Sequence, residues 1–257
     1  RVLIALQQPL SHIRNFAGNR LYFETSAKLV SEDTNNAIDV YEYDLGGDTY
    51  ELISTGRSEE GSYLLDVSPD GEHLYAASHD GVLAVFDRDP SDGALTATTL
   101  YQNWNDDSLH RWIDDIAVGP DGRFAYVSIS GDKAYVFQRD AATGTLIRIH
   151  AAPGDPDLYS SVPSLAFAPD GAHLYACAGA GGMLVFRVDT VCGALTLIGT
   201  IENTDTTQGL TPQAAVVSPD GTFVIACSSM ENALLVLDRA APVDFPTPIG
   251  VESITLN

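Results

Sequence analysis

Short apolar runs, each bounded by Gly, Asp, Pro or Ser, follow one another along most of the chain. One cycle contains four such runs, which cover residues 62–68, 73–77, 82–86 and 94–100. Runs of this length that are rich in Val, Leu, Tyr, Phe and Thr are typical of β-strands. No stretch of useful length repeats its apolar residues with the period of a helix. The pattern therefore predicts short strands joined by tight turns.

A Pro-Asp-Gly motif marks the same point of four successive cycles. Its copies begin at Pro69, Pro120, Pro169 and Pro219, so the steps between them are 51, 49 and 50 residues. Pro presets φ for a turn position and Gly allows a positive φ, so each copy predicts a turn, with its Asp as a turn residue. A fixed period in this range indicates a repeat architecture.

A further cycle precedes these four and keeps their phase without the motif. Residues 17–19, Ala-Gly-Asn, stand where Pro-Asp-Gly is expected, and strands are predicted over 20–24, 39–43 and 50–54. At the other end, prolines surround the last predicted strand, 249–254, and proline is tolerated only at a sheet edge or before a strand. Residues 2–6 form an additional apolar run.

Four antiparallel strands in each cycle of about 50 residues are the sequence signature of a β-propeller blade. We therefore predict an all-β fold, a β-propeller of about five four-stranded antiparallel blades in a single domain, residues 1–257. The blades are expected over 11–57, 58–107, 108–157, 158–207 and 208–257, with a possible closing strand in 1–10. Five blades form either a closed five-bladed ring or part of a larger ring, for example a seven-bladed one.

The second to fourth cycles resemble the blades of the lactonase-type (YVTN) β-propeller family. In the second cycle the resemblance rests on Ser-Pro-Asp-Gly-Glu-His-Leu-Tyr at 68–75, Val-Phe-Asp-Arg-Asp at 85–89 and Asp-Gly-Ala-Leu-Thr at 92–96. The first cycle instead resembles the TolB-like blades of secreted bacterial proteins, over 20–27 and 39–44. These resemblances imply an exported protein that is secreted, periplasmic or on the cell surface.

The chain is strongly acidic, with 35 acidic and 13 basic side chains and a formal net charge of −22. Nucleic acids and anionic membranes need a basic surface, so neither is an expected partner, and no apolar run is long enough for insertion into a membrane. Three cysteines do not make a disulfide framework. Cys177 and Cys227 lie at equivalent positions of successive cycles, and we expect both to be small buried strand residues.

The lactonase-type resemblance also implies a His-X-His segment before the Pro-Asp-Gly strand. The third cycle has Trp112 and Asp114 at these positions, and the other cycles have no His there. The sequence therefore favours a non-enzymatic binding or scaffold module that presents loops to a protein or glycan partner. The alternative is a lactonase-like hydrolase or isomerase that acts on a small sugar lactone or carboxylate in the central channel. Whether the chain is an enzyme stays open, as does its oligomeric state.

The richest polar segment is 105–115, which joins the second cycle to the third. His110 could act as a general base that is oriented by an Asp such as Asp114. Arg111 could hold a carboxylate or a phosphate. His110, Arg111 and Asp114 are the catalytic candidates; the alternative is a solvated loop with Trp112 packed between blades.

One loop offers oxygen ligands of the kind that calcium prefers. Asp33, Asn35 and Asp39 lie close together in the sequence, although not at EF-hand spacing. They are the candidate ligands of a structural calcium ion, and an ordinary Asx-rich turn is the alternative. No other cofactor is predicted.

Overall fold

The computed structural model describes a set of segments that together hold most of the predicted strands. These segments are 10–17, 20–25, 31, 39–44, 49–52, 63–78, 81–101, 112–130, 134–151, 162–178, 182–201, 211–228, 233–239 and 247–253. All regular structure within them is β-strand, so these segments contain no helix that could cross a membrane.

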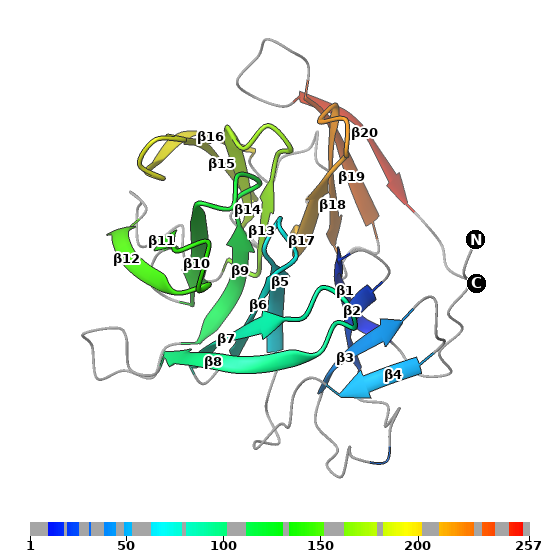
Figure 1. Cartoon of the computed structure of the whole chain (residues 1–257). Helices are drawn as coiled ribbons and strands as arrows, with labels where there is room; N and C mark the ends of the chain where they lie inside the picture. Colours follow the sequence, from blue (N-terminus) through cyan, green and yellow to red (C-terminus); the bar gives the residue numbers. More distant parts are fainter. Residues whose placement is uncertain are drawn as a thin grey trace. The chain divides into compact units, whose positions relative to one another are not determined.

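The strands of these segments form five four-stranded antiparallel sheets, here called blades 1 to 5 (Figure 1). Blade 1 contains β1 (Leu10–Ala17), β2 (Arg20–Thr25), β3 (Asp39–Asp44) and β4 (Thr49–Leu52). Blade 2 contains β5 (Tyr63–Val67), β6 (His73–Ser78), β7 (Leu83–Arg88) and β8 (Leu95–Tyr101). Blade 3 contains β9 (Ile113–Val118), β10 (Phe124–Ile129), β11 (Ala134–Arg139) and β12 (Leu146–Ala151). Blade 4 contains β13 (Ser164–Phe167), β14 (His173–Cys177), β15 (Met183–Val188) and β16 (Leu195–Ile201). Blade 5 contains β17 (Ala214–Val217), β18 (Phe223–Ser228), β19 (Ala233–Asp238) and β20 (Thr247–Ser253).

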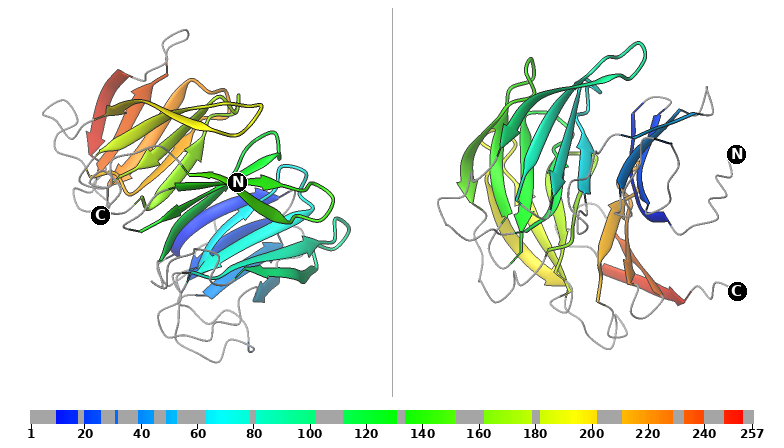
Figure 2. Two further views of the ribbon diagram at one scale, coloured as in Figure 1. Left: turned by 90° about the vertical axis from the view of Figure 1, so that its left-hand side faces the viewer. Right: turned by 90° about the horizontal axis from the view of Figure 1, so that it is seen from below.

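In every blade the strands pair in the order in which they follow along the chain, as the two views of Figure 2 also show. Four antiparallel strands in sequence order are the topology of a propeller blade. The predicted all-β fold of about five four-stranded blades is therefore confirmed. The apolar run 2–6 lies outside the described residues.

The chain forms two compact units, Arg1–Ile113 and Asp114–Asn257, each of which is described by itself. The first unit holds blades 1 and 2, and β1 contacts β5 there. The second unit holds blades 3 to 5, since the division falls at the first residue of β9. Within it, β13 contacts β17. The single domain and its blade boundaries stay predictions.

The Pro-Asp-Gly motif forms the turn between the first and second strands of blades 2 to 5. In blade 2 the N–H of Gly71 donates to the carbonyl of Ser68 at 2.8 Å, and Gly71 has φ of 73°. The carboxylate of Asp70 accepts a hydrogen bond from the N–H of Glu72 at 3.1 Å. The same bond, from the N–H two residues further on, is made by Asp121, Asp170 and Asp220. The prediction that these Asp residues stabilise turns is confirmed.

The fourth strand of blades 2 to 5 carries one extra residue. In blade 2, Val85 pairs with Thr99 and Phe86 with Ala97, so Thr98 bulges out of the ladder. The same shift recurs opposite the third strands of the other three blades. In blade 5 it lies beside Pro248, on the edge strand β20. This edge position is the one expected for a proline within a strand.

The core of the second unit lies between the faces of consecutive blades. On β14, Leu174 and Ala176 pack in the cluster with blade 3, whereas Tyr175 and Cys177 pack in the cluster with blade 5. Because successive side chains of a strand point to opposite faces, a strand between two blades is apolar throughout. This explains why β14 reads Leu-Tyr-Ala-Cys over 174–177, with no polar residue between the apolar ones.

The prediction of buried thiols is right for Cys177 and wrong for Cys227. Cys177 is buried, and this burial raises the pKa of its thiol. Cys227 is exposed, because it lies on the face of blade 5 that points away from blade 4. All three cysteines are free.

Candidate functional site

Asp114 is the catalytic candidate that lies among the described residues. It is the second residue of β9, and its side chain is half-buried. One carboxylate oxygen, Oδ2, accepts a hydrogen bond from the N–H of Val162 at 3.1 Å. His110 and Arg111 lie outside the described residues, so the predicted pairing of His110 with Asp114 stays a prediction.

The next residue, Asp115, is buried and holds two strands together. Its Oδ2 accepts a hydrogen bond from the N–H of Leu165 on β13 at 2.7 Å, and its Oδ1 accepts one from the N–H of Ile116 at 2.9 Å. Ser128 of blade 3 donates through Oγ to the carbonyl of Val162 at 2.9 Å. Blade 3 therefore fixes the start of the first strand of blade 4 through two side chains, Asp115 and Ser128, in addition to Asp114.

The contact made by Asp115 recurs one blade further on. Ser164 precedes its Pro-Asp-Gly motif by the same number of residues as Asp115 does, and its Oγ accepts a hydrogen bond from the N–H of Ala215 at 3.3 Å. In blades 3 and 4, a polar side chain at this position thus holds the first strand of the following blade. Sequence reasoning missed both residues, although their shared place in the repeat was the available signal.

We expect Asp115→Ala to lower the free energy of unfolding by about 1–3 kcal/mol, because it leaves the buried N–H of Leu165 without its acceptor. Asp115→Asn keeps an acceptor oxygen and should lose less. Urea unfolding followed by circular dichroism measures both variants. Equal stability of the alanine variant and the wild type would contradict the role of Asp115.

Trp112 stands directly before β9, two residues before Asp114, and its side chain is 57% exposed. The blades that it joins, 2 and 3, belong to the two separate units, so the alternative in which Trp112 packs between blades stays a prediction.

The guanidinium of Arg239 connects blades 4 and 5 through hydrogen bonds and an ion pair. Arg239 donates through Nη1 to the carbonyl of Gly221 at 3.2 Å, contacts Nδ1 of His173 at 2.9 Å, and forms an ion pair with Asp170. Partial burial alone would raise the pKa of Asp170, but the hydrogen bonds from Arg239 and from the N–H of Ala172 outweigh it and lower this pKa. Arg239 therefore connects the turn of its own blade with the turn of the preceding one.

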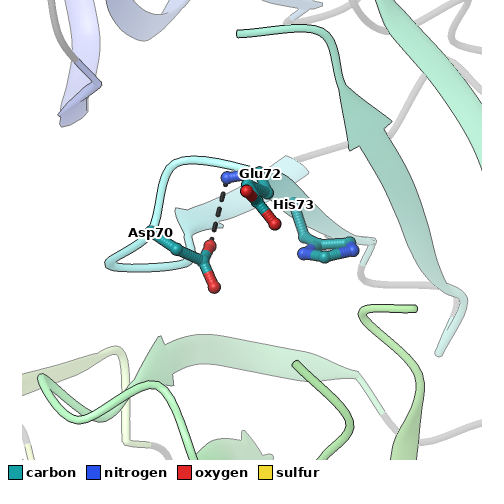
Figure 3. A group of neighbouring side chains, drawn as sticks. All are labelled: Asp70, Glu72 and His73. Carbon is teal, nitrogen blue, oxygen red and sulfur yellow. Dashed lines mark hydrogen bonds between the residues drawn. The ribbon is translucent and has the colours of Figure 1, made fainter. Parts of the chain in front are cut away.

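Within the described segments, one group of side chains has the composition of a metal site. Asp70, Glu72 and His73 bring one potential ligand atom each to within 4.8 Å of the others (Figure 3). Asp70 and Glu72 are exposed, whereas His73 is buried. In blade 4 the equivalent residues, Asp170 and His173, bind the guanidinium of Arg239. This position of the repeat therefore serves a charged hydrogen bond in blade 4, and the three side chains alone do not indicate an ion.

The predicted calcium loop is largely outside the described residues. Asp39 is the first residue of β3, where it pairs with Thr25. Asp33 and Asn35 are not among the described residues, so calcium binding here stays a prediction.

A comparison with protein-family models supports the fold. Residues 52–87 match the family model described as "WD domain, G-beta repeat". No curated protein sequence matches the chain.

Many solved structures are similar to this one. A Bacteroides uniformis protein described as a "putative 6-phosphogluconolactonase" is 20% identical, with a TM-score of 0.67, over 93% of this chain and 72% of its own. The periplasmic gluconolactonase PpgL of Pseudomonas aeruginosa is 17% identical, with a TM-score of 0.65, over 92% and 68%. The β-propeller domain of Myceliophthora thermophila Cps50 (Swd1) is 12% identical, with a TM-score of 0.61, over 94% and 71%. At these identities the similarity concerns the fold. The chain is built from β-propeller repeats.

Proposed function

We propose that the chain is a lactonase-type β-propeller that binds a small, uncharged sugar lactone and hydrolyses it. The observation that carries this proposal is the similarity of nearly the whole chain to two structures with lactonase names, PpgL and the Bacteroides uniformis protein. The Pro-Asp-Gly blades, which resemble the lactonase-type family in sequence, support the same assignment.

Asp114 is the best-placed described residue for this chemistry. Its half-buried carboxylate stands in the first strand of blade 3, and the N–H of Val162 holds one of its oxygens. In the proposed reaction, water attacks the lactone carbonyl carbon while Asp114 or His110 accepts the proton of the water. The ring C–O bond then breaks, the ring oxygen takes up a proton, and a hydroxy acid is released. Arg111 would bind the carboxylate of this product.

The charge of the chain favours an uncharged substrate. A formal net charge of −22 raises the energy of an approaching phosphate ester, whereas a neutral lactone is not repelled. We therefore expect a preference for a sugar lactone of the gluconolactone type over its 6-phosphate. We also propose that the protein acts outside the cytoplasm, because its first blade resembles the blades of secreted proteins.

The test measures lactone opening by pH-stat with the purified chain. We expect hydrolysis of glucono-δ-lactone above the spontaneous rate, and a slower reaction with the 6-phosphate at low salt. Asp114→Asn keeps an oxygen for the N–H of Val162 but cannot take up a proton, so kcat/KM should fall by about 10²–10⁴. Asp121→Asn, in an exposed Pro-Asp-Gly turn, is the matched control and should leave the rate unchanged.

A rate equal to the spontaneous one for both lactones would overturn the proposal. The second candidate is then a non-enzymatic module that binds a protein or a glycan. One observation favours it, because Asp114 and Asp115 both hold backbone N–H groups of the next blade, which is a structural task. An active wild type with an equally active Asp114→Asn variant would keep the lactonase assignment and remove Asp114 from the site.

A further inference from the structure

The side chain of His173 contacts the next blade. His173 is the first residue of β14, and its Nδ1 lies 2.9 Å from Nη2 of Arg239, the residue directly after β19 of blade 5. A guanidinium has only donors, so Nδ1 is the acceptor of this hydrogen bond. The imidazole therefore carries its proton on Nε2 and is uncharged, because an imidazolium has no acceptor.

A carboxylate of blade 4 binds the same guanidinium nitrogen. Nη2 of Arg239 forms an ion pair with Oδ2 of Asp170, in the Pro-Asp-Gly turn before β14. Asp170 and His173 of blade 4 are thus joined through one nitrogen of blade 5, and we call these three side chains the His173 cluster. Both blades belong to the second unit, where β13 contacts β17, so the cluster lies at a described contact between neighbouring blades.

The same place between blades 3 and 4 is apolar. Val188 ends β15, and its N–H bonds to the residue after the Pro-Asp-Gly motif of its own blade, as the N–H of Arg239 does in blade 5. Phe124 follows its Pro-Asp-Gly motif at the same spacing as His173. Phe124 and Val188 pack in one hydrophobic cluster. An apolar pair gains no proton, so of these two places only the one between blades 4 and 5 can respond to pH.

Cationic groups outnumber the carboxylate around His173. The titratable and charged side chains that face it are Asp170 from the preceding turn, Tyr175 from β14, Arg187 from the paired position of β15, and Arg239 from blade 5. Tyr175 is uncharged, because burial raises its pKa. Asp220, in the turn of blade 5, accepts hydrogen bonds within its own turn, and the blade 5 side chains that pack in the cluster with Tyr175 are apolar. A protonated His173 would therefore be a third cation beside one carboxylate.

We propose that the His173 cluster is a pH-sensitive contact that holds blade 5 to blade 4 at neutral pH and releases Arg239 when His173 is protonated. A proton on Nδ1 removes the acceptor of Arg239 and brings two cations together. The imidazolium then donates to Asp170 in place of the guanidinium, so an ion pair between blades becomes one within blade 4. Mild acid therefore weakens the packing of blade 5, whether or not the chain hydrolyses lactones.

Stability at this contact rises with pH. The guanidinium groups disfavour the charged imidazole, so His173 binds a proton less readily in the folded chain than in the unfolded one, and stability rises with pH where the unfolded state binds more protons. An ordinary histidine titrates near about pH 6.5, so the contribution is complete above this pH and is lost as the pH falls below it. Asp170 stays ionised in this range. Partial burial alone would raise its pKa, but the hydrogen bonds from Arg239 and from the N–H of Ala172 lower it.

NMR titration of the folded 257-residue protein measures the protonation of His173 directly. We expect the tautomer with the proton on Nε2 at neutral pH, and a midpoint about one pH unit below that of histidine in the urea-unfolded chain. Arg239→Gln should raise this midpoint toward the unfolded value. Arg148→Gln, at an exposed position of β12 in blade 3, is the matched control and should leave it unchanged. A wild-type midpoint equal to or above that of the unfolded chain would overturn the proposal.

His173→Asn assigns the His173 signal and gives the second readout. The asparagine offers Arg239 an acceptor oxygen but cannot take up a proton. We expect the folding equilibrium constant of the wild type, divided by that of the variant, to fall about fivefold between about pH 7.5 and about pH 5.5, as a midpoint difference of about one pH unit requires. Of the six histidines, the other five are present in both proteins and cancel in this ratio. Urea unfolding at each pH measures it, and a ratio that is constant or rises on acidification would contradict the proposed contact.

Hydrogen exchange tests the release of blade 5. After correction for the intrinsic effect of pH, we expect β18 and β19 to exchange faster in the wild type than in His173→Asn at about pH 5.5, and equally at about pH 7.5. β10 and β11 of blade 3, which meets blade 4 through the apolar pair, serve as the internal reference and should exchange alike in both proteins. Equal protection of blade 5 in the two proteins at the lower pH would show that protonation does not release it, and the proposal would fail.

Discussion

Replacement of Tyr126 by Ala is expected to lower the free energy of unfolding by about 3–5 kcal/mol, as for a large buried aromatic residue. Tyr126 is buried in the cluster between blades 3 and 4. Its ring meets Phe167 edge to face at a centroid distance of 5.0 Å. Its hydroxyl donates to the carbonyl of Gly193 at 3.0 Å, and burial raises the pKa of Tyr126, so the hydroxyl stays protonated. The substitution therefore removes packing, a ring contact and a hydrogen bond together.

Two variants separate these contributions in urea unfolding. Tyr126→Phe keeps the ring and should lose only about 1 kcal/mol for the hydrogen bond to Gly193. Ile147→Ala, at a side chain that is 65% exposed, should change the stability by less than about 0.5 kcal/mol. If Tyr126→Ala were no more destabilising than Tyr126→Phe, the packing of blade 3 against blade 4 would not be a main source of stability.

Gly193→Ala is expected to lower the free energy of unfolding by about 2–5 kcal/mol, from two independent causes. Gly193 has φ of +76°, a conformation that is strained for alanine. A Cβ at this position would also lie 2.7 Å from Cδ1 of Phe124, and the turn cannot easily retreat, because the N–H of Gly193 donates to the carbonyl of Asp189 at 2.7 Å. Thermal and urea unfolding measure the loss.

Gly171→Ala is the matched control for this substitution. Gly171 has φ of +68°, but the nearest atom to its added Cβ is Cδ of Pro120 at 3.8 Å, which is ordinary contact. It should therefore lose only the backbone part, about 1–2 kcal/mol. The difference between the two variants measures the clash with Phe124, and equal losses would show that Phe124 moves away without cost.

Local sequence signals were sufficient for most of the described strands and for the Pro-Asp-Gly turns, although β1 was not predicted. The strands Ile113–Val118 and His173–Cys177 begin and end where the apolar runs predict, because Pro-Asp-Gly and the other turn residues interrupt the runs directly. The fourth-strand bulges were not predicted. The extra residue is Thr98 in blade 2 and an isoleucine in blades 3 to 5, and such β-branched residues are common at any strand position. It is recognised only because no residue of the third strand pairs with it.

The contacts between blades could not be predicted from the sequence of a single repeat. Asp115 accepts a hydrogen bond from the N–H of Leu165, 50 positions later in the chain. The sequence does not show which backbone N–H a side chain will meet in the folded protein. Cys177 and Cys227 have the same place in the repeat, but the burial of Cys177 depends on its packing against side chains of blade 5. For the candidate site, the half-buried place of Asp114 is new information, whereas the roles proposed for His110 and Arg111 still rest on the sequence alone.

The bulged fourth strands have a consequence for the behaviour of the protein at high concentration. β8, β12, β16 and β20 are edge strands of their sheets, and an unbroken edge strand can pair with the edge of another molecule and start aggregation. The extra residue interrupts the regular row of donors and acceptors on all four strands. On β20, Pro248 removes one donor altogether, and on β8 the hydroxyl of Thr98 turns back to the carbonyl of Val85 at 3.1 Å. Each of these edges is therefore a poor template for intermolecular β-sheet.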